Sequence, residues 1–419
     1  MEFNKYRLKD IAEYKNERIE TNQLTTVNYI STENLLPNKQ GKQSASNLPS
    51  SKTVKKYTES DILISNIRPY FKKIWQADNI GGISNDVLNI TSSNEKISND
   101  YLYYYLSQDK FFQYMTQTSK GTKMPRGDKE AIMEFEIQVP KNVKYQNFIS
   151  NLGKFLDNKI KVNTEIIENL EKLSQTLFKH WFVDFEFPDK NGNPYKSSGG
   201  EMVDSELGEI PKGWRVETLE KLGSIVGGGT PSKKNKEYYT NNGIPWITPK
   251  DLSKNRNIYI SHGENDISEL GLNKSSAKLL EKNSVLFSSR APIGYIAINN
   301  IPVTTNQGFK SIVPNEEMNP YFIYFILKNI TPLIEQTASG STFKEISAKG
   351  LKSIKIVFPS IELIEHYGNI VKKYFEEINF LENQNIKLIE LRDTLLPKLM
   401  SGEIEIPDDI EVNNDELSI

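Results

Sequence analysis

The stretch DILISNIRPYFKK, residues 61–73, returns later in the chain as NSVLFSSRAPIGY, residues 283–295. This alignment places Arg68 over Arg290. Flanking segments repeat in the same order: NYISTENL (28–35) and PWITPKDL (245–252), TSKGTKMPRGDKEAI (118–132) and TASGSTFKEIS (337–347), EIQVP (136–140) and KIVFP (355–359). The offset varies between 217 (245 minus 28) and 222 (283 minus 61), as expected when loops accept insertions and structural elements do not. The sequence therefore predicts two copies of one structural unit.

Each copy combines strand and helix patterns. Apolar residues alternate at Ile62 and Ile64, and again in the second copy, which is typical of strands. YLYYYLSQDKFFQYM (101–115) and YFIYFILKNI (321–330) have the pattern of short amphipathic helices. We therefore predict an α+β fold with two mixed α/β domains related by pseudo-twofold symmetry.

A long helix is expected after each domain. Apolar residues recur every seven positions from Ile149 to Leu177, with a second row offset by three, and a matching row runs from Tyr367 to Leu395. Paired rows of this kind are typical of a coiled coil. Asn163 and Lys159 interrupt the first row, where they either fix the register or are partly exposed. The residues predicted to form the seam are Leu152, Leu156, Leu170, Leu173, Leu177, Val371, Tyr374, Ile378, Leu381, Leu388 and Leu395.

The two helices are expected to pair with each other. Because each helix leaves its domain in the same sense, a twofold relation makes the pair antiparallel and separates the domains. At 1.5 Å per residue, about 30 helical residues span roughly 45 Å. The alternative is that the apolar rows are ordinary core packed against the globular domains.

Composition changes along the chain suggest its divisions. The tail carries acidic residues and no Lys or Arg, so we expect it to be solvated and disordered. The linker is rich in Gly, Pro, Ser and Asn. The predicted divisions are a first domain at 1–142, its helix at 143–186, a linker at 187–212, a second domain at 213–360, its helix at 361–402 and the acidic tail at 403–419.

The composition excludes several kinds of chemistry. The chain has 419 residues, a formal net charge of −2 and no cysteine, which excludes disulfides, thiolate metal sites and cysteine nucleophiles. No apolar run approaches the roughly 20 residues of a membrane span, and the N-terminus MEFNKYRLKD has no apolar signal segment. We therefore expect a cytoplasmic protein without membrane contact.

Motifs for catalysis are missing. There is no GxxxxGK[ST] phosphate loop, and we interpret the triple glycine Gly227 to Gly229 as a turn. His180, His262 and His366 are far apart in sequence, so no metal site is expected. The motifs of amino-methyltransferases and metal-dependent nucleases are also incomplete. We predict that this chain has no catalytic residue, no metal ligand and no bound cofactor.

Four segments resemble the specificity subunit of type I restriction-modification systems. They are LRDTLLPKLMSGEI (391–404), GWRVETL (213–219), GIPWITPKDL (243–252) and GTKMPRGDKEAI (121–132), and the resemblance covers essentially the whole chain. It implies two target-recognition domains, each reading half of a bipartite double-stranded DNA site, joined by two helices in an antiparallel coiled coil. The similar helix endings, LSQTLFKHWFVDFEFP (173–188) and LRDTLLPKLMSGEIEIP (391–407), then mark where each helix meets a methylating partner.

The resemblance also implies partners and cofactors. Two methyltransferase subunits use S-adenosylmethionine to methylate adenine, and motor-nuclease subunits use ATP and Mg²⁺. The specificity chain itself is non-catalytic in that family. Two other functions remain possible: a free-standing nuclease or methyltransferase, and a coiled-coil scaffold or adaptor without DNA sequence preference.

DNA binding requires basic side chains on phosphates and a few side chains at base edges. Arg68 and Arg290, each just after a predicted strand, are suited to a bidentate bond with guanine or phosphate. The alternative for each candidate is a structural ion pair or a solvated position. The candidates are Lys52, Lys55, Lys56, Asn66, Arg68, Lys72, Lys120, Lys123 and Arg126 in the first domain, and Lys233, Lys234, Lys250, Arg290, Lys310 and Lys344 in the second.

Overall fold

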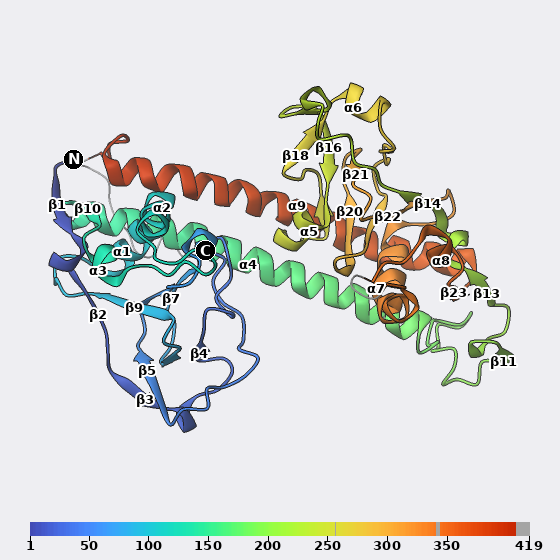
Figure 1. The fold of residues 1–419 in the computed structure, drawn as a ribbon. Coiled ribbons are helices and arrows are strands. Elements are labelled where there is room, and N and C mark those ends of the chain that lie inside the picture. The colour runs from blue at the N-terminus through green and yellow to red at the C-terminus, as the bar shows by residue number, and fades with distance from the viewer. Residues whose placement is uncertain (256, 341–343, 408–419) are drawn as a thin grey trace. The chain divides into compact units, whose positions relative to one another are not determined.

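The computed structural model describes residues 1–255, 257–340 and 344–407. The chain forms two compact units (Figure 1). Among the described residues, unit 1 comprises Met1–Lys161 and residues 386–407, and unit 2 comprises Val162–Asn385. Residues 408–419 of the predicted acidic tail lie outside the described residues.

Unit 1 contains a globular domain of short strands and helices. A two-stranded sheet pairs β1 (Phe3–Arg7) with β10 (Glu136–Pro140). One four-stranded sheet has the order β2 (Ala12–Tyr14), β9 (Val87–Ser92), β6 (Ile62–Ser65), β7 (Ile74–Gln76), and the other has β3 (Arg18–Glu20), β5 (Thr53–Tyr57), β8 (Gly81–Ile83), β4 (Tyr29–Ile30). The helices are α1 (Asn99–Leu106), α2 (Asp109–Gln117) and α3 (Lys129–Met133). The central strand β6 is buried along its whole length and shares one core with α1 and α2.

Unit 2 contains a domain of the same kind. A two-stranded sheet pairs β13 (Arg215–Thr218) with β23 (Lys355–Phe358). A five-stranded sheet has the order β14 (Gly223–Gly227), β22 (Lys310–Pro314), β19 (Val285–Ser289), β20 (Ile293–Asn299), β17 (Tyr259–Ile260). A four-stranded sheet has the order β15 (Tyr239–Thr240), β18 (Asn265–Ile267), β16 (Ile244–Ile247), β21 (Thr304–Thr305). The helices are α5 (Pro249–Lys254), α6 (Glu269–Asn273), α7 (Pro320–Thr337) and α8 (Ala348–Lys352).

The strand pairings confirm the predicted duplication and the α+β class. The pair β1 and β10 corresponds to β13 and β23, and the order β2-β9-β6-β7 corresponds to β14-β22-β19-β20. In unit 1 the pair β4 with β8 is parallel and the other strand pairs are antiparallel, and the corresponding pair in unit 2, β16 with β21, is also parallel. Unit 2 adds a second parallel pair, β17 with β20. The two globular domains therefore share one fold, although their sequences differ.

The predicted alignment of Arg68 with Arg290 is wrong by one residue. Left-handed backbone occurs at Ser60 (φ 67°) and Arg68 (φ 50°), and again at Asn283 (φ 68°) and Ala291 (φ 50°). Both pairs are eight residues apart, so Arg68 corresponds to Ala291 and Ile67 corresponds to Arg290. Matching the letter R concealed this shift, because backbone conformation and not residue identity defines the register.

The predicted linker at 187–212 contains regular structure. Strands β11 (Met202–Ser205) and β12 (Gly208–Pro211) form an antiparallel hairpin. The ring of Phe187 stacks on Tyr195 at 4.6 Å and on Trp214 at 5.1 Å between centroids. The segment is thus an ordered connection, and its Gly and Pro residues belong to its turns.

Two long helices contribute to both units. The first, α4 (Val143–Phe182), leaves unit 1 after Lys161, and the second, α9 (Ile361–Ser401), returns to unit 1 after Asn385. The predicted helical spans were 143–186 and 361–402. Each compact unit therefore holds a globular domain, part of α4 and part of α9.

Within unit 2, α4 and α9 run antiparallel. The Asn163 side-chain amide donates to Gln384 Oε1 at 2.7 Å and to Asn385 Oδ1 at 2.8 Å, and the Tyr367 hydroxyl donates to the Ser174 carbonyl at 3.1 Å. Moving forward along α4 therefore means moving backward along α9. Asn163 is fully buried, as a residue that fixes the register of two helices should be.

The apolar seam of α4 differs from the prediction. Its second row is offset by four residues and not three, because Ile167, Ser174 and Trp181 are the half-buried or buried members. Placing Leu173 in the seam is wrong, since that residue is 57% exposed. The small side chain of Ser174 takes the position and leaves room for Tyr367, which binds its carbonyl group.

The other predicted seam residues are at least partly buried. Some of them also pack against the domain cores, so the apolar rows serve both the helix pair and the domains. Phe375, outside the predicted rows, is fully buried. The interlocking of a coiled coil stays a prediction. Leu156, Val371, Ile378 and Leu381 are buried, whereas Leu152, Leu170, Leu177, Tyr374, Leu388 and Leu395 are half-buried.

The two similar helix endings have a role inside the chain. Each long helix ends in the main hydrophobic core of the unit that it enters. The buried residues of the endings are Phe178, Trp181 and Phe182 of α4 in unit 2, and Leu396, Leu399 and Met400 of α9 in unit 1. The endings therefore anchor each helix, and contact between them and a methylating partner stays a prediction.

Leu170 and Leu173 offer a matched test of the seam. Leu170→Asp places a carboxylate against the core of unit 2, and should lower the free energy of unfolding by about 2 kcal/mol or more. Leu173→Asp changes an exposed position of the same helix, and should alter it by less than about 0.5 kcal/mol. Urea unfolding of both variants measures the difference. Equal effects would contradict the four-residue offset.

Candidate nucleic-acid interface

The first group of predicted DNA-binding residues lies where strand β6 ends. Asn66 and Arg68 follow β6 and are joined to the loop that precedes α3: the Gly127 amide donates to the Asn66 carbonyl at 2.9 Å, and the Arg68 amide to the Pro125 carbonyl at 2.8 Å. Main-chain hydrogen bonds between Lys120 and Arg126 close that loop. We define the first strand-end cluster as Asn66, Arg68, Asp86, Lys120, Lys123 and Arg126.

Arg126 and Lys123 are the most accessible cations of this cluster. The Arg126 side chain is 57% exposed, with Nη2 at 3.4 Å from Asp86 Oδ1. Lys123 is exposed and has no ion pair among the described residues. Lys120 is paired with the Asp128 carboxylate at 2.5 Å. Contact with a polyanion is therefore open to Arg126 and Lys123 without breaking a short ion pair.

Asn66 and Arg68 are less accessible than the prediction requires. Asn66 is buried, and Arg68 is half-buried with a left-handed backbone. Asn66 Oδ1 and Arg68 Nε are enclosed and have no hydrogen-bond partner among the described residues. These two residues shape the strand end, and their backbone groups hold the loop that presents Arg126.

The second strand-end cluster lies at the equivalent place in unit 2. Glu345 Oε2 is 3.3 Å from Arg290 Nη1, and Glu345 Oε1 is 3.5 Å from Lys310 Nζ. Lys310 Nζ also donates to the Gln307 carbonyl at 3.4 Å, and the Thr230 hydroxyl donates to Gln307 Oε1. The predicted residues Arg290 and Lys310 are thus brought together by a carboxylate. We define this cluster as Thr230, Arg290, Gln307, Lys310 and Glu345.

The triple glycine positions Thr230 for this cluster. Gly227 ends β14, and a Cβ atom at Gly228 would lie 2.0 Å from the Asn306 carbonyl oxygen. A Cβ atom at Gly229 would lie 2.3 Å from the Ala277 amide nitrogen. Only glycine allows this close approach of backbones. The interpretation of the triple glycine as a turn is wrong, because Gly227 is the last residue of β14 and Gly228 and Gly229 form no turn. The glycines are instead needed where two backbones pass close to each other.

A basic strand pair forms a second cationic surface in unit 1. Arg18 on β3 lies directly opposite Lys55 on β5, and like charges in that relation repel. Burial, followed by the charges of Lys129 and Arg18, lowers the pKa of Lys55. Lys52 is exposed at the start of the same strand, whereas Lys56 is paired with Glu17 at 3.3 Å. Neither Arg18 nor Lys55 has an ion pair among the described residues, and a DNA phosphate would supply the missing negative charge.

Of the other candidates, three have partners among the described residues and two are exposed. Lys72 is 2.7 Å from Asp109 and Lys250 is 2.9 Å from Glu264, so both have structural ion pairs. Lys344 donates to the Glu335 carbonyl at 3.3 Å. Lys233 and Lys234 are exposed in the loop between β14 and β15.

Reasoning from sequence missed four charged residues of these surfaces. Arg18 and Lys129 join Lys55, and Asp86 and Glu345 pair with the strand-end cations. Arg18 had a usable signal, since a strand pairing of β3 with β5 would have placed it opposite a lysine. Asp86 and Glu345 had none, because each meets its partner only in the folded domain.

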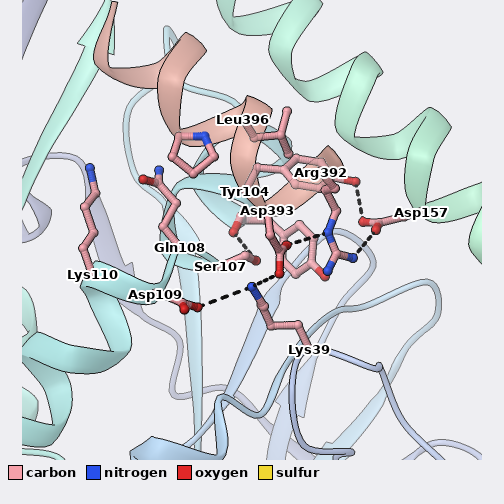
Figure 2. Close-up of a pocket in the computed structure, with 12 residues that line it drawn as sticks. Lys39, Tyr104, Ser107, Gln108, Asp109, Lys110, Asp157, Arg392, Asp393 and Leu396 are labelled. Carbon is pink, nitrogen blue, oxygen red and sulfur yellow. Dashed lines mark hydrogen bonds and ion pairs between the residues drawn. The ribbon is translucent and has the colours of Figure 1, made fainter. Parts of the chain in front are cut away.

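The cavity near the end of α9 is a structural anchor. Its volume is about 230 Å³, and most of its charged groups are in ion pairs (Figure 2). Lys110 instead donates to the Tyr105 hydroxyl at 2.9 Å. Arg392 Nη1 is 2.6 Å from Asp157 Oδ1, and its Nε is 3.0 Å from Asp393 Oδ1. Lys39 Nζ is 2.7 Å from Asp393 Oδ2 and 3.5 Å from Asp109 Oδ1. These bonds tie α9 to α4 and to the globular domain of unit 1.

Arg392→Met should weaken this anchor. The change leaves the carboxylates of Asp157 and Asp393 without the guanidinium group, and should lower the free energy of unfolding by about 1–3 kcal/mol. Lys398→Met is the control, because it removes an exposed ion pair with Glu403 at the same helix end. Thermal unfolding measures both. If Arg392→Met lowers the stability no more than Lys398→Met does, Arg392 does not anchor α9.

Two negative findings apply to the described residues. None of their helices is long and apolar enough to cross a membrane. No set of three His, Asp or Glu residues in the described parts of the chain is arranged to hold a metal ion.

Two related domains with cationic surfaces are features of a nucleic-acid-recognition protein, and comparison with known proteins gives the family. A family model described as the type I restriction modification DNA specificity domain matches residues 1–172 and again residues 211–391. The chain therefore belongs to this family, and its function is DNA sequence recognition.

Individual relatives agree with the family. The chain is 28% identical over 466 residues to the type I restriction enzyme HindI specificity subunit of Haemophilus influenzae, covering 96% of this chain and 100% of the relative. It is 39% identical over 186 residues to the MjaIX specificity subunit of Methanocaldococcus jannaschii, but that match spans only 44% of this chain and 42% of the relative. The crystal structure of the S subunit from M. genitalium has the same fold, with a TM-score of 0.59 at 18% identity over 98% of this chain and 97% of that one.

Proposed function

We propose that this chain is the subunit that selects the DNA target of a type I restriction-modification complex. The domain of unit 1 reads one half-site of a bipartite sequence, and the domain of unit 2 reads the other. The bases between the half-sites are not read. Recognition by this chain then directs adenine methylation and ATP-dependent restriction by partner subunits.

The duplication with unlike side chains is the observation that carries this proposal. The family model matches each half separately, and the strand pairings of the two halves correspond. The strand-end clusters nevertheless present different residues on the same backbone: Arg126 in unit 1 and Glu345 in unit 2. Two copies of one scaffold with different side chains suit two half-sites of different sequence.

The proposed complex contains partners that supply the chemistry. Two methyltransferase subunits bind S-adenosylmethionine, and motor-nuclease subunits bind ATP and Mg²⁺. This chain binds none of these cofactors and is not itself an enzyme. The complex acts on DNA in the cytoplasm. The relatives described above, which are specificity subunits of type I restriction enzymes, support this assignment.

A scaffold or adaptor without DNA preference is the competing function. It would use the paired helices to assemble other subunits and would leave the basic surfaces without a purpose. The like-charge pair of Arg18 and Lys55 favours the DNA-binding function, because repulsion of this kind is relieved by a bound phosphate.

Mapping of methylated adenines tests the proposal. A host that carries this chain and its methyltransferase partner should show one bipartite methylated motif, and deletion of the chain should abolish it. The map gives both half-sites and their spacing. A methylation pattern that is the same with and without the chain would contradict the proposed function.

Lys55→Gln should separate stability from DNA binding. Removing one charge of the Arg18–Lys55 pair should raise the free energy of unfolding by about 0.2–0.5 kcal/mol, because like charges repel across strands. The same change should weaken DNA binding roughly 3- to 10-fold at low salt and reduce the slope of log affinity against log salt by about one. Fluorescence anisotropy of the chain with its methyltransferase subunits measures binding.

Lys5→Gln is the matched control for this experiment. Lys5 is an exposed strand lysine that lies opposite Gln138, so its removal relieves no repulsion. We expect no gain in stability and no change in the salt slope. If Lys55→Gln behaves like Lys5→Gln in both measurements, the basic strand pair does not bind DNA.

A further inference from the structure

Arg126 and Glu345 occupy the same position in the two halves. In unit 1, Arg126 forms bridges with Ile67 and Lys120; in unit 2, Glu345 forms bridges with Arg290 and Ser339. The next residue donates to the strand end in both cases: Gly127 to Asn66 at 2.9 Å, and Ile346 to Ser289 at 3.1 Å. The N-cap of the following helix lies two residues after Arg126 and Glu345: it is Asp128 before α3 and Ser347 before α8.

The charges at this position are reversed between the halves. In unit 1 the loop residue Arg126 is the cation and the strand-end residue Asp86 is the anion. In unit 2 the loop residue Glu345 is the anion, and the cations are Arg290, just after β19, and Lys310, the first residue of β22. The backbone is held by main-chain bonds in both halves, so the side chain is free to differ.

Stability does not explain these side chains. The ion pairs are 3.3 to 3.5 Å long, and Arg126 and Glu345 are 57% and 37% exposed, although Lys310 is only 14% exposed. Ion pairs at such exposure contribute little to stability. An exposed carboxylate also opposes binding of a polyanion, unless it accepts a hydrogen bond that DNA donates.

The chemistry of base edges gives each side chain a partner. A guanidinium group donates two parallel hydrogen bonds to guanine O6 and N7 in the major groove. A carboxylate accepts from the exocyclic amino group of cytosine N4. Arg290 and Lys310, which each pair with one oxygen of the Glu345 carboxylate, hold it in place for such a bond.

We propose that Arg126 and Glu345 are specificity-determining residues at equivalent positions, and that Arg126 selects a guanine in one half-site while Glu345 selects a cytosine in the other. This inference rests on the proposed function. It goes beyond it by naming one base and one side chain in each half.

The experiment maps methylated adenines for the complex of this chain with its methyltransferase partner. Arg126→Gln should relax the guanine of one half-site and leave the other half-site unchanged. Glu345→Gln should relax the cytosine of the opposite half-site only. With duplexes carrying the substituted base, we expect each variant to lose roughly 5- to 100-fold of the discrimination shown by the unchanged chain.

Matched controls remove the same kinds of contact elsewhere. Glu264→Gln removes a carboxylate that bridges two lysines of unit 2, Lys250 at 2.9 Å and Lys254 at 3.1 Å. Arg7→Gln removes an arginine that is 56% exposed and paired with Glu134. Neither control should alter the motif.

The possible outcomes are distinct. A motif that stays the same in both variants, or one that lacks the guanine or the cytosine in the unchanged chain, overturns the inference. Equal weakening of both half-sites together with a lowered unfolding temperature assigns the residues a structural role and also overturns it. If the unchanged chain gives no bipartite motif at all, the proposed function itself fails.

Discussion

The structure depends on the insertion of each long helix into the core of a second unit. Helix α4 begins with Tyr145 and Ile149 in the core of unit 1 and ends with Trp181 in the core of unit 2. Helix α9 begins with Tyr367 in unit 2 and ends with Met400 in unit 1. The core of each unit is therefore completed by the end of a helix that begins in the other unit. Removing either helix end would expose large apolar side chains of that core to water.

Buried polar groups give the helix pair its register. An apolar seam alone tolerates sliding, whereas Asn163 is fully buried and bonds with Gln384 and Asn385 at a single alignment. Glu382 adds a second constraint, since its carboxylate accepts from the amides of Ile258 at 2.6 Å and Tyr259. Burial raises the pKa of Glu382 to about 8. These contacts join α9 to the globular domain of unit 2.

One fold can serve two half-sites because main-chain bonds hold the loops, while the side chains on those loops are free to differ. Main-chain hydrogen bonds hold the strand-end loops in both units, so Arg126 and Glu345 differ in charge without a change of backbone. The basic strand pair of unit 1 shows a different principle. There the repulsion between Arg18 and Lys55 lowers the stability of the free protein. A DNA phosphate that relieves this repulsion would bind more tightly by the same free energy.

The sequence by itself determined the duplication, the α+β class and the existence of two long helices, because repeats and apolar periodicity are local properties of a chain. The tertiary structure alone decided which residues meet. Leu173 is more apolar than Ser174, yet Ser174 faces α9, because the packing of Tyr367 requires a small side chain there.

Charge partners were equally invisible in the sequence. Lys72 and Lys250 were predicted to bind DNA because they are basic, but in the folded chain they pair with Asp109 and Glu264. Glu345 is 55 residues away from Arg290, and only the pairing of a loop with a strand end makes them neighbours. Which cations stay free for DNA is therefore a property of the folded domain, since an ion pair depends on distance in space and not on distance along the chain.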